Sequence, residues 1–413
     1  AMSRRQRQMC IRDSLNPESN YQIYGVIMPV KNRFAELQKE ISEWRHDIHQ
    51  HPEILFETLR TSALVKDKLI EFGCDQVIDG IGKTGVVGVI NGQTNRSGKV
   101  IGLRADMDAL PINEETGLDY KSKIPGAMHA CGHDGHTSML LGAAKYLCET
   151  RNFDGQAVVI FQPAEEGGGG GLEMCKDGLM ENFKIDEVYG MHNWPGVELG
   201  KFAIRSGPFF AASDFIEATI SGKGGHAAKP QETIDPTVIA SQIVVALQTI
   251  ASRRADPVKQ VVVSVTSFET SSNAFNVIPQ EVKIKGTVRT LDPEVRDLAE
   301  KEFLRITKLT AEALGGSADA KYTRGYPVMS NSDQQTEFAA KVARDVSGKC
   351  DEAPLVMGGE DFAYMLEERP GAYILIGNGD SAPVHHPEYN FNDDAIPFGC
   401  SWLVEIVEQK MPV

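Results

Sequence analysis

Apolar and polar residues alternate along the chain with two different periods. Between Phe34 and His49 apolar side chains recur every three to four positions, which predicts an amphipathic helix. Further on, short runs of β-branched residues alternate with helical runs. We expect strands at Val100–Leu103, Ala157–Phe161 and Val188–Met191, and helices at Thr137–Cys148 and Gly171–Met180. This alternation predicts an α/β fold with a largely parallel central sheet.

The rhythm changes between about residues 213 and 326, where the order becomes strand, helix, strand, strand, helix, strand. The expected elements are Phe215–Ile220, Pro236–Ser252, Val261–Phe268, Glu281–Arg289, Pro293–Ala313 and Ala318–Tyr322. This βαββαβ order is that of a ferredoxin-like unit, so we expect a self-contained insert.

The α/β pattern resumes after the insert. A helix is expected at Asp333–Val346, a strand at Tyr373–Ile376 and a closing helix at Ile396–Gln409. We therefore expect a catalytic body formed by residues 28–212 and 327–413, interrupted by an inserted domain at 213–326. Residues 1–27 carry Arg4, Arg5 and Arg7 near their start with no apolar stretch behind them, which does not fit a secretory signal. We interpret them as a disordered or non-native tail, with the natural start near Met28.

Composition restricts the possible partners and the compartment. The formal net charge of −15 argues against a nucleic-acid binder or a protein of anionic membranes, because both call for basic surfaces. No apolar run approaches the roughly 20 residues that span a bilayer. The seven cysteines are odd in number and widely scattered, which indicates a reducing compartment. We expect a cytoplasmic protein.

Metal-binding side chains are concentrated in MHACGHDGHTSMLLGAA, just before an apolar helix. Cys131 and His133 stand two apart there, and thiolate and imidazole are ligands of zinc and similar metals. An isolated C-x-H is more often a buried cysteine beside a surface histidine. Together with the surrounding motifs, however, this pair favours metal ligation.

Carboxylates and imidazoles follow the expected strands. Glu165 and Glu166 come after the second strand and precede five glycines, so that one can bind a metal while its neighbour carries a proton. A solvated acidic loop is the alternative for this pair. His192 ends the third strand, and a packed core histidine is the alternative there.

Further candidates flank these residues. Asp106 and Asp108 follow the first strand, where aspartates commonly orient a ligating imidazole. The C-terminal segment PVHHPEYNF offers His385 and His386, and a turn beside proline can direct one of them inward. GGEDFA adds two acidic residues to which the sequence assigns no role.

Taken together, the motifs HACGHDGH, QPAEEGGGG, MHNWPG, GKGGHAAKPQETIDP, GGEDFA and VHHPEYNFND resemble a known family. It is the metallo-amidohydrolase family that includes hippurate hydrolase, bacterial N-acyl-amino-acid deacylases and plant indole-acetyl-amino-acid hydrolases. The resemblance runs from about Arg45 to Trp402. It implies two divalent ions, manganese favoured, with zinc, nickel and cobalt as alternatives.

The resemblance also implies roles for individual residues. It gives a catalytic role to Glu165 as general base, supported by Asp108, and it places His226 over the substrate, where an imidazole could stabilise an oxyanion. Asn276 and Arg289 become candidates for binding the substrate carboxylate, although Arg289 could equally be a strand-surface charge. The implied metal ligands are Cys131, His133, Glu166, His192 and His385, with His386 as an alternative to His385.

We therefore expect an enzyme that hydrolyses the amide bond of small N-acyl amino acids, with an acetyl, benzoyl or aryl-acetyl group. A homodimer through the inserted domain, which also closes over the site as a lid, is expected from the resemblance alone. Two alternatives stay open: a dinuclear metallopeptidase acting on dipeptides, and a non-catalytic ligand-binding relative.

Overall fold

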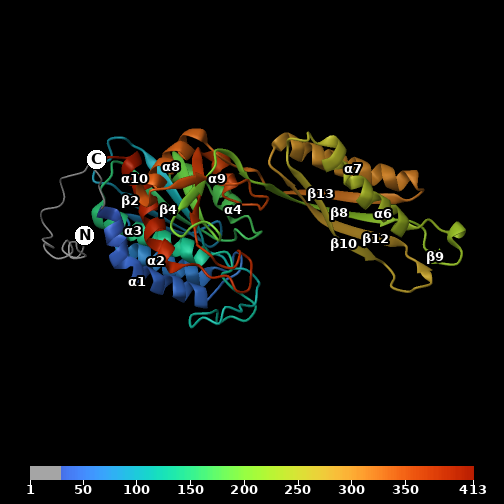
Figure 1. The fold of residues 1–413 in the computed structure, drawn as a ribbon, viewed down its shortest axis with the longest axis horizontal. Coiled ribbons are helices and arrows are strands. Elements are labelled where there is room, and N and C mark those ends of the chain that lie inside the picture. The colour runs from blue at the N-terminus through green and yellow to red at the C-terminus, as the bar shows by residue number, and fades with distance from the viewer. Residues whose placement is uncertain (1–28) are drawn as a thin grey trace, which may run out of the picture.

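The computed structural model describes residues 29–413 (Figure 1). The expected tail at residues 1–27 and the natural start near Met28 lie outside this range. The chain forms two bodies side by side: a large α/β body that contains the two ends of the described chain, and a smaller body formed by the middle of the sequence. The smaller body corresponds to the expected insert.

An eight-stranded sheet forms the centre of the large body. Its order is β1 (Gln76–Ile81), β2 (Gly85–Asn91), β4 (Gln156–Gln162), β3 (Val100–Asp106), β5 (Glu187–Trp194), β16 (Gly371–Gly377), β6 (Phe202–Ile204) and β15 (Cys350–Glu352). The four adjacent strands β4, β3, β5 and β16 are all parallel, whereas β1 and β2 pair in antiparallel fashion. The expectation of a largely parallel sheet is confirmed.

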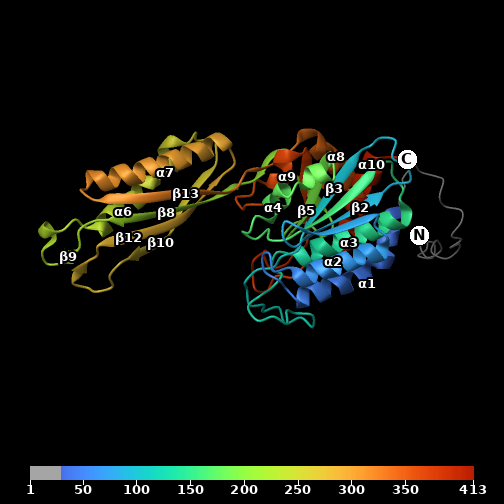
Figure 2. The ribbon, with the colours of Figure 1, turned by 180° about the vertical axis from the view of Figure 1, so that it is seen from behind.

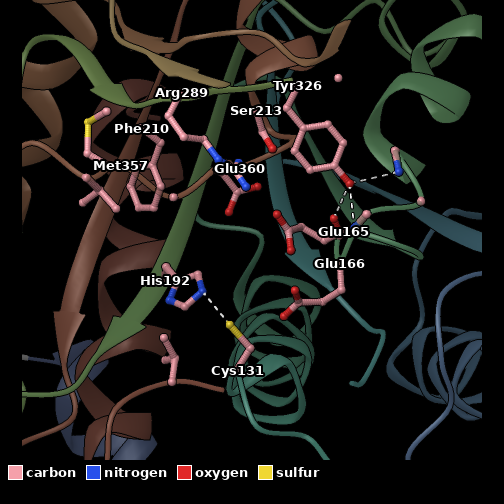
Figure 3. Close-up of a pocket in the computed structure, with 18 of the residues that line it drawn as sticks. Cys131, Glu165, Glu166, His192, Phe210, Ser213, Arg289, Tyr326, Met357 and Glu360 are labelled. Atoms are coloured by element: carbon pink, nitrogen blue, oxygen red, sulfur yellow. Dashed lines mark hydrogen bonds between the residues drawn. The ribbon is translucent and has the colours of Figure 1, made fainter. Parts of the chain in front are cut away.

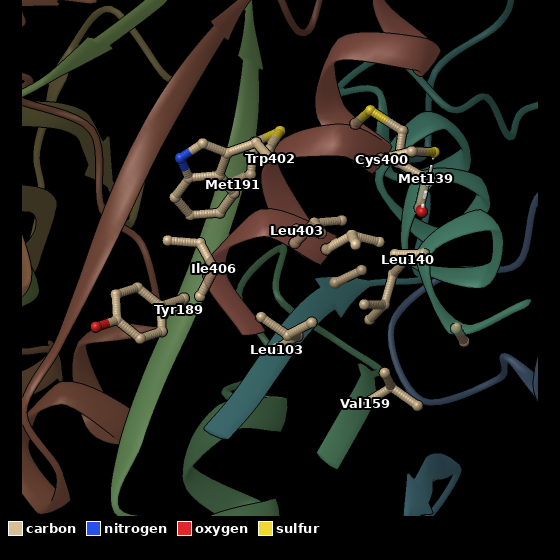
Figure 4. Close-up of a cluster of buried hydrophobic side chains, with 14 of the residues drawn as sticks. Leu103, Met139, Leu140, Val159, Tyr189, Met191, Cys400, Trp402, Leu403 and Ile406 are labelled. Atoms are coloured by element: carbon tan, nitrogen blue, oxygen red, sulfur yellow. Dashed lines mark hydrogen bonds between the residues drawn. The ribbon is translucent and has the colours of Figure 1, made fainter. Parts of the chain in front are cut away.

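The sheet has an apolar layer on each face. Along β4 the side chains alternate, because Ala157, Val159 and Phe161 join one buried cluster while Val158 and Ile160 join the other. The first face is covered by α1 (Pro29–Gln50), α2 (Leu59–Phe72), α3 (His133–Thr150), α8 (Asp333–Ser347) and α10 (Ile396–Lys410). The second face is covered by α4 (Gly170–Lys176), α5 (Leu179–Asn182) and α9 (Ala363–Glu368). Figure 4 shows how Trp402 and Leu403 of α10 face Met191 of β5 and Leu140 of α3.

The insert has its own sheet and its own core. Four antiparallel strands stand in the order β10 (Val261–Thr270), β12 (Glu281–Thr290), β8 (Ala212–Ser221) and β13 (Ser317–Tyr326). The helices α6 (Pro236–Leu247) and α7 (Pro293–Ala313) pack on one face (Figure 2). The ferredoxin-like order is therefore confirmed, while the domain boundaries at 213 and 326 stay a prediction.

Several elements differ from the sequence expectation. The expected helix at Gly171–Met180 breaks into α4 and α5, because Gly178 between them has a left-handed backbone with φ of 82°. The helix expected to end at Ser252 ends at Leu247, and a π-helical turn follows at Ile250–Arg254.

Other elements were not anticipated. They are α2, the hairpin β1–β2, the short strands β6 and β15, α9, the pair β7 (Gly207–Phe210) with β14 (Met329–Asn331), the pair β9 (Gly225–His226) with β11 (Val277–Ile278), and 3-10 turns at Pro230–Glu232 and Asp393–Ala395. Most of these are too short to show a clear period. Among the residues from 29 to 413, no helix is long and apolar enough to cross a membrane.

Gly190 of β5 lies opposite Tyr373 of β16 and leaves room for its ring. An added Cβ at Gly190 would lie 2.7 Å from Cδ2 of Tyr373, whose side chain is fully buried. We expect Gly190→Ala to destabilise the large body by about 1–3 kcal/mol, because an overpacked core forces strained side chains. Denaturant unfolding measures this. Gly358→Ala is the control, since its Cβ would lie 3.5 Å from the nearest atom, and equal unfolding midpoints for the two variants would contradict the packing argument.

Candidate active site

A pocket of about 550 Å³ lies beyond the carboxyl ends of the central strands, where the large body meets the insert. Its floor is formed by the loop between β3 and α3, the loop after β4 and the last residues of β5, as expected for a ligand site in an open α/β sheet. Its lining includes Cys131, Glu165, Glu166 and His192, which are labelled in Figure 3. His385 also lines it.

The turn Cys131-Gly132-His133 depends on its central glycine. Gly132 has φ of 87°, and a Cβ there would lie 2.2 Å from Nδ2 of Asn193. Only glycine fits this conformation and this space. The turn places Cys131 in the pocket and makes His133 the first residue of α3.

Two imidazoles in this region are oriented by backbone carbonyls. Nδ1 of His133 lies 2.9 Å from the carbonyl oxygen of Asp108, and Nδ1 of His192 lies 2.5 Å from that of Asn193. If each Nδ1 donates, each Nε2 offers a lone pair. Nε2 of His192 lies 3.3 Å from Sγ of Cys131, and Nε2 of His133 is buried with no hydrogen-bond partner among residues 29–413. A buried nitrogen without a partner, beside a thiol and a second imidazole, fits a metal ion.

Glu166 and His385 approach from the other side of Cys131. Nε2 of His385 lies 3.1 Å from Oε1 of Glu166, and ligand atoms of Cys131, Glu166 and His385 lie within 4.8 Å of one another. His385 lines the pocket, whereas Nδ1 of His386 accepts a hydrogen bond from the backbone N–H of Glu388. The geometry thus brings His385, rather than His386, to the pocket.

Cys131 belongs to two candidate ligand groups. It stands with His133 and His192 in one and with Glu166 and His385 in the other. All five residues that the resemblance implied as ligands are therefore brought together around one sulfur. The two groups overlap at Sγ of Cys131.

Glu165 is buried, and its backbone is held from two sides. Its N–H donates to Oδ1 of Asp108 at 2.9 Å, and its carbonyl accepts from the hydroxyl of Tyr326 at 2.5 Å. The N–H of Glu166 donates to Oδ2 of Asp108 at 3.1 Å. Asp108 therefore fixes the Glu165-Glu166 peptide with its carboxylate. Nδ1 of His133 lies 2.9 Å from the backbone carbonyl oxygen of Asp108 and 3.4 Å from its Oδ1.

The pocket holds an excess of negative charge. Burial, and then the charges of Glu360, Glu166 and Asp361, raise the pKa of Glu165 well above its ordinary value. Burial and the charges of Glu166 and Glu165 likewise raise the pKa of the Cys131 thiol. A cation bound among these groups would counter both shifts, since it favours thiolate and carboxylate.

The pKa of His133 shifts in the direction that favours the charged form of this side chain. Burial alone would lower its pKa, but Asp106, Asp108 and Glu166 outweigh burial and raise the pKa to about 10. A metal ion at Nε2 requires the neutral imidazole, so metal binding competes with protonation of His133 and depends on pH. Burial, followed by the charge of His136, lowers the pKa of His192, so that imidazole is neutral and ready to ligate.

Asp106 contacts His136, which is not among the implied ligands, more closely than His133, whose Nε2 lies 3.7 Å from Oδ2 of Asp106. Its Oδ1 lies 2.7 Å from Nδ1 of His136, and its Oδ2 accepts from Nη1 of Arg104 at 2.7 Å. Nε2 of His136 accepts the backbone N–H of Asn193 at 2.9 Å, so both ring nitrogens are already engaged. His136 is thus unsuited to ligation although it is close to the site.

Of the three residues expected from the insert, only Arg289 reaches the pocket. Its guanidinium forms no hydrogen bond or ion pair with the described part of the chain, and it points toward Glu360 in Figure 3. Burial lowers its pKa. His226 and Asn276 do not line this pocket. They lie on the exposed β9–β11 ribbon, where the Ala227 N–H donates to the carbonyl of Asn276 at 3.0 Å, at the outer end of the insert (Figure 1).

Several pocket residues were not anticipated from the sequence. Tyr326 holds the Glu165 loop, and an aromatic and apolar wall is formed by Trp194, Phe210, Val356 and Met357. Nothing in the local sequence marks the wall as part of a site, because its members come from distant segments. Arg104 does not line the pocket but pairs with Glu360, which does. It could have been found, since an arginine within an apolar strand run is unusual.

Comparison with known proteins agrees with this geometry. The sequence profile described as "Peptidase family M20/M25/M40" matches residues 102–409. The chain is 44% identical over 377 residues to a hippurate hydrolase of Campylobacter jejuni, which covers 90% of this chain and 96% of the relative. It is 40% identical over 378 residues to an N-acetyl-L-cysteine deacetylase of Bacillus subtilis, with 91% and 89% covered.

A solved structure is also similar. The YXEP protein of Bacillus subtilis, a dinuclear metal-binding peptidase of the M20 family, has a TM-score of 0.79 and 32% identity, with 91% of this chain and 99% of that chain covered. The fold, the pocket and these relatives define the class, a hydrolase of amide bonds. The chain belongs to the peptidase family M20/M25/M40.

Proposed function

We propose that the protein hydrolyses N-acyl amino acids and releases a carboxylic acid and a free amino acid. The observation that carries this proposal is the unpaired guanidinium of Arg289 in the same pocket as Glu165 and the candidate ligands. A planar guanidinium suits a carboxylate, which every N-acyl amino acid carries at a short distance from its amide. The named activities of the two relatives support the same substrate class.

We further propose that two divalent ions are held by Cys131, His133, Glu166, His192 and His385. When bound, such ions polarise an amide carbonyl and lower the pKa of a water molecule. Mixed thiolate, imidazole and carboxylate ligation admits manganese, zinc, nickel or cobalt, with manganese favoured.

The chain's own groups provide the proton transfers. The Glu165 carboxylate accepts a proton from the attacking water and delivers it to the amide nitrogen as the C–N bond breaks. The two N–H bonds to Asp108 and the Tyr326 hydroxyl keep the backbone of Glu165 in place during both transfers. Glu165 can serve both steps because it is buried beside the pocket and its backbone cannot shift freely.

We propose that the acyl group of the substrate binds against the aromatic wall. Phe210 packs edge-on against Trp194 with ring centroids 6.0 Å apart, and Trp194 in turn packs edge-on against His192 at 5.9 Å. A rigid apolar surface therefore adjoins a candidate metal ligand. It favours a benzoyl or aryl-acetyl group over acetyl.

A substrate panel tests the proposed function against the peptidase alternative, which the description of the YXEP protein keeps open. N-benzoyl-glycine and N-acetyl-glycine should be hydrolysed, the former with the higher kcat/KM, whereas free dipeptides should react poorly. Phe210→Ala should lower kcat/KM for the benzoyl substrate about 10-fold and change the acetyl substrate little, because one apolar contact is worth about 1–3 kcal/mol. Preference for free dipeptides would favour the peptidase.

Glu165→Gln tests the proton carrier. The glutamine side chain of this variant cannot accept a proton from water. We therefore expect kcat to fall by at least about 100-fold, within the range for general acid–base groups. Metal content measured by plasma mass spectrometry should stay near the unmodified level. Cys131→Ala is the matched variant, which should lose metal, and full activity in either variant would refute its assigned role.

Arg289→Met tests carboxylate binding. We expect KM for N-benzoyl-glycine to rise at least about 10-fold, because a charge-assisted hydrogen bond is lost. The corresponding substrate amide, which has no carboxylate, should be hydrolysed equally by both proteins. An equal loss for the acid and the amide would show that Arg289 acts on something other than the carboxylate.

We also propose that the protein is a homodimer and that His226 acts in the partner's site. His226 and Asn276 lie together on an exposed ribbon outside their own pocket, beside the fully exposed Phe275. Val262 and Phe268 on the edge strand β10 are also exposed, so the insert offers an apolar surface to a second copy. There His226 would meet the developing oxyanion.

Sedimentation should show a dimer, and subunit mixing tests the role of His226. Glu165→Gln and His226→Ala proteins should each be nearly inactive. After subunit exchange at equal amounts, half the dimers are mixed and each carries one intact site, so about a quarter of the unmodified activity should return. No recovery, with exchange verified by mass spectrometry, would place His226 in its own chain's site or outside the reaction.

A further inference from the structure

Two cysteines outside the pocket lie in contact. Sγ of Cys74, just after α2, is 3.6 Å from Sγ of Cys148, in the last turn of α3. The two are 74 residues apart in sequence, and both are half-buried rather than sealed in the core. Neither residue lines the pocket or belongs to a candidate ligand group among the described residues.

Arg151 holds the two segments together. Its Nη1 donates to Oδ2 of Asp75 at 2.6 Å, and its Nη2 donates to the carbonyl of Gly73 at 2.9 Å. The Arg151 guanidinium therefore contacts both chain neighbours of Cys74, and Arg151 itself lies three residues after Cys148. The contact between the sulfurs is thus fixed by an ion pair and a hydrogen bond.

The surroundings also favour a reactive thiol at Cys148. The hydrogen bond from Cys74, and then the charge of Arg151, lower the pKa of Cys148 despite partial burial. The other five described cysteines all have a raised pKa, in most cases because burial disfavours the thiolate. Thiolate character and access decide which cysteine reacts first with an oxidant.

We propose that Cys74 and Cys148 form a reversible oxidation site for hydrogen peroxide. The Cys148 thiolate attacks one peroxide oxygen and the O–O bond breaks, which leaves a sulfenic acid on Cys148 and releases one water after proton uptake. The Cys74 sulfur then attacks the Cys148 sulfur, the S–O bond breaks, and a second water leaves as the Cys74 proton is transferred. Two thiols supply the two electrons that reduce the peroxide, and a dithiol reductant reverses the change.

The disulfide would tie the end of α2 to the end of α3. His133 begins α3, and the fifteen residues from there to Cys148 rise about 22 Å, so the change occurs far from the candidate ligands. Oxidation should therefore stabilise the large body by restricting the unfolded chain and leave hydrolysis intact.

Intact mass and thermal unfolding test the proposal on the full chain. Stoichiometric peroxide should remove two hydrogens, give a Cys74–Cys148 peptide on digestion and raise the thermal midpoint by roughly 5 °C. Cys148→Ser should abolish the crosslink, Cys74→Ser should leave a sulfenic acid that dimedone traps, and Cys350→Ser, the control, should behave as the unmodified protein. Arg151→Met should form the same crosslink at least several-fold more slowly.

Three other outcomes of the peroxide experiment would overturn the proposal. If Cys131 or Cys350 is oxidised while Cys74 and Cys148 remain thiols, the pair is not an oxidation site. A crosslink that forms only between two chains would also overturn the proposal. So would a sulfenic acid that persists at Cys148 while Cys74 is intact, since the resolving step would then not occur.

Discussion

The guanidinium of Arg104 is the contact on which the active-site end of the sheet depends. It is fully buried at the end of β3, within 2.7 Å of Asp106, 3.0 Å of Asp361 and 3.2 Å of Glu360. Its Nε donates to Oε1 of Gln162 at 2.9 Å. Removing one partner from such a network typically costs about 3–5 kcal/mol, because an uncompensated charge stays buried.

Arg104 connects the two halves of the site. On one side Asp106 engages His136, which accepts the N–H of Asn193, and the Asn193 side chain donates to the carbonyl of Cys131 at 2.7 Å. On the other side Glu360 lies beside Glu165 and accepts from the hydroxyl of Tyr373 at 2.6 Å. The turn Cys131-Gly132-His133 and the loop that carries Glu165 are therefore linked through the buried Arg104 guanidinium.

The sequence predicted the regular elements and the local motifs better than their connections. Strands β3, β4 and β5 and both helices of the insert could be located because their hydrophobic periods are clear. The aromatic wall and the Arg104 network could not, since they join residues far apart in sequence. The position of Asp106 suggested an imidazole partner, but sequence alone could not tell His136 from a ligating histidine.

In the insert too, the sequence did not predict contacts between residues that are far apart along the chain. The motif around His226 was recognisable, yet the sequence did not show that His226 lies outside the pocket of its own chain. Arg289 was equally compatible with a strand-surface charge, and only its position without a partner in the pocket makes it a candidate for carboxylate binding. The large body contributes acidic side chains to the pocket, and the insert contributes the Arg289 guanidinium, which has no partner among residues 29–413.

Anomalous diffraction from crystals of the manganese-loaded protein tests the proposed metal site most directly. We expect two peaks, each within bonding distance of Sγ of Cys131, one beside His192 and the other beside His385. Nε2 of His136 should still accept from Asn193. A single peak, or an ion bound by His136 or by Glu360 and Asp361 instead of Cys131, would contradict the proposed ligand set.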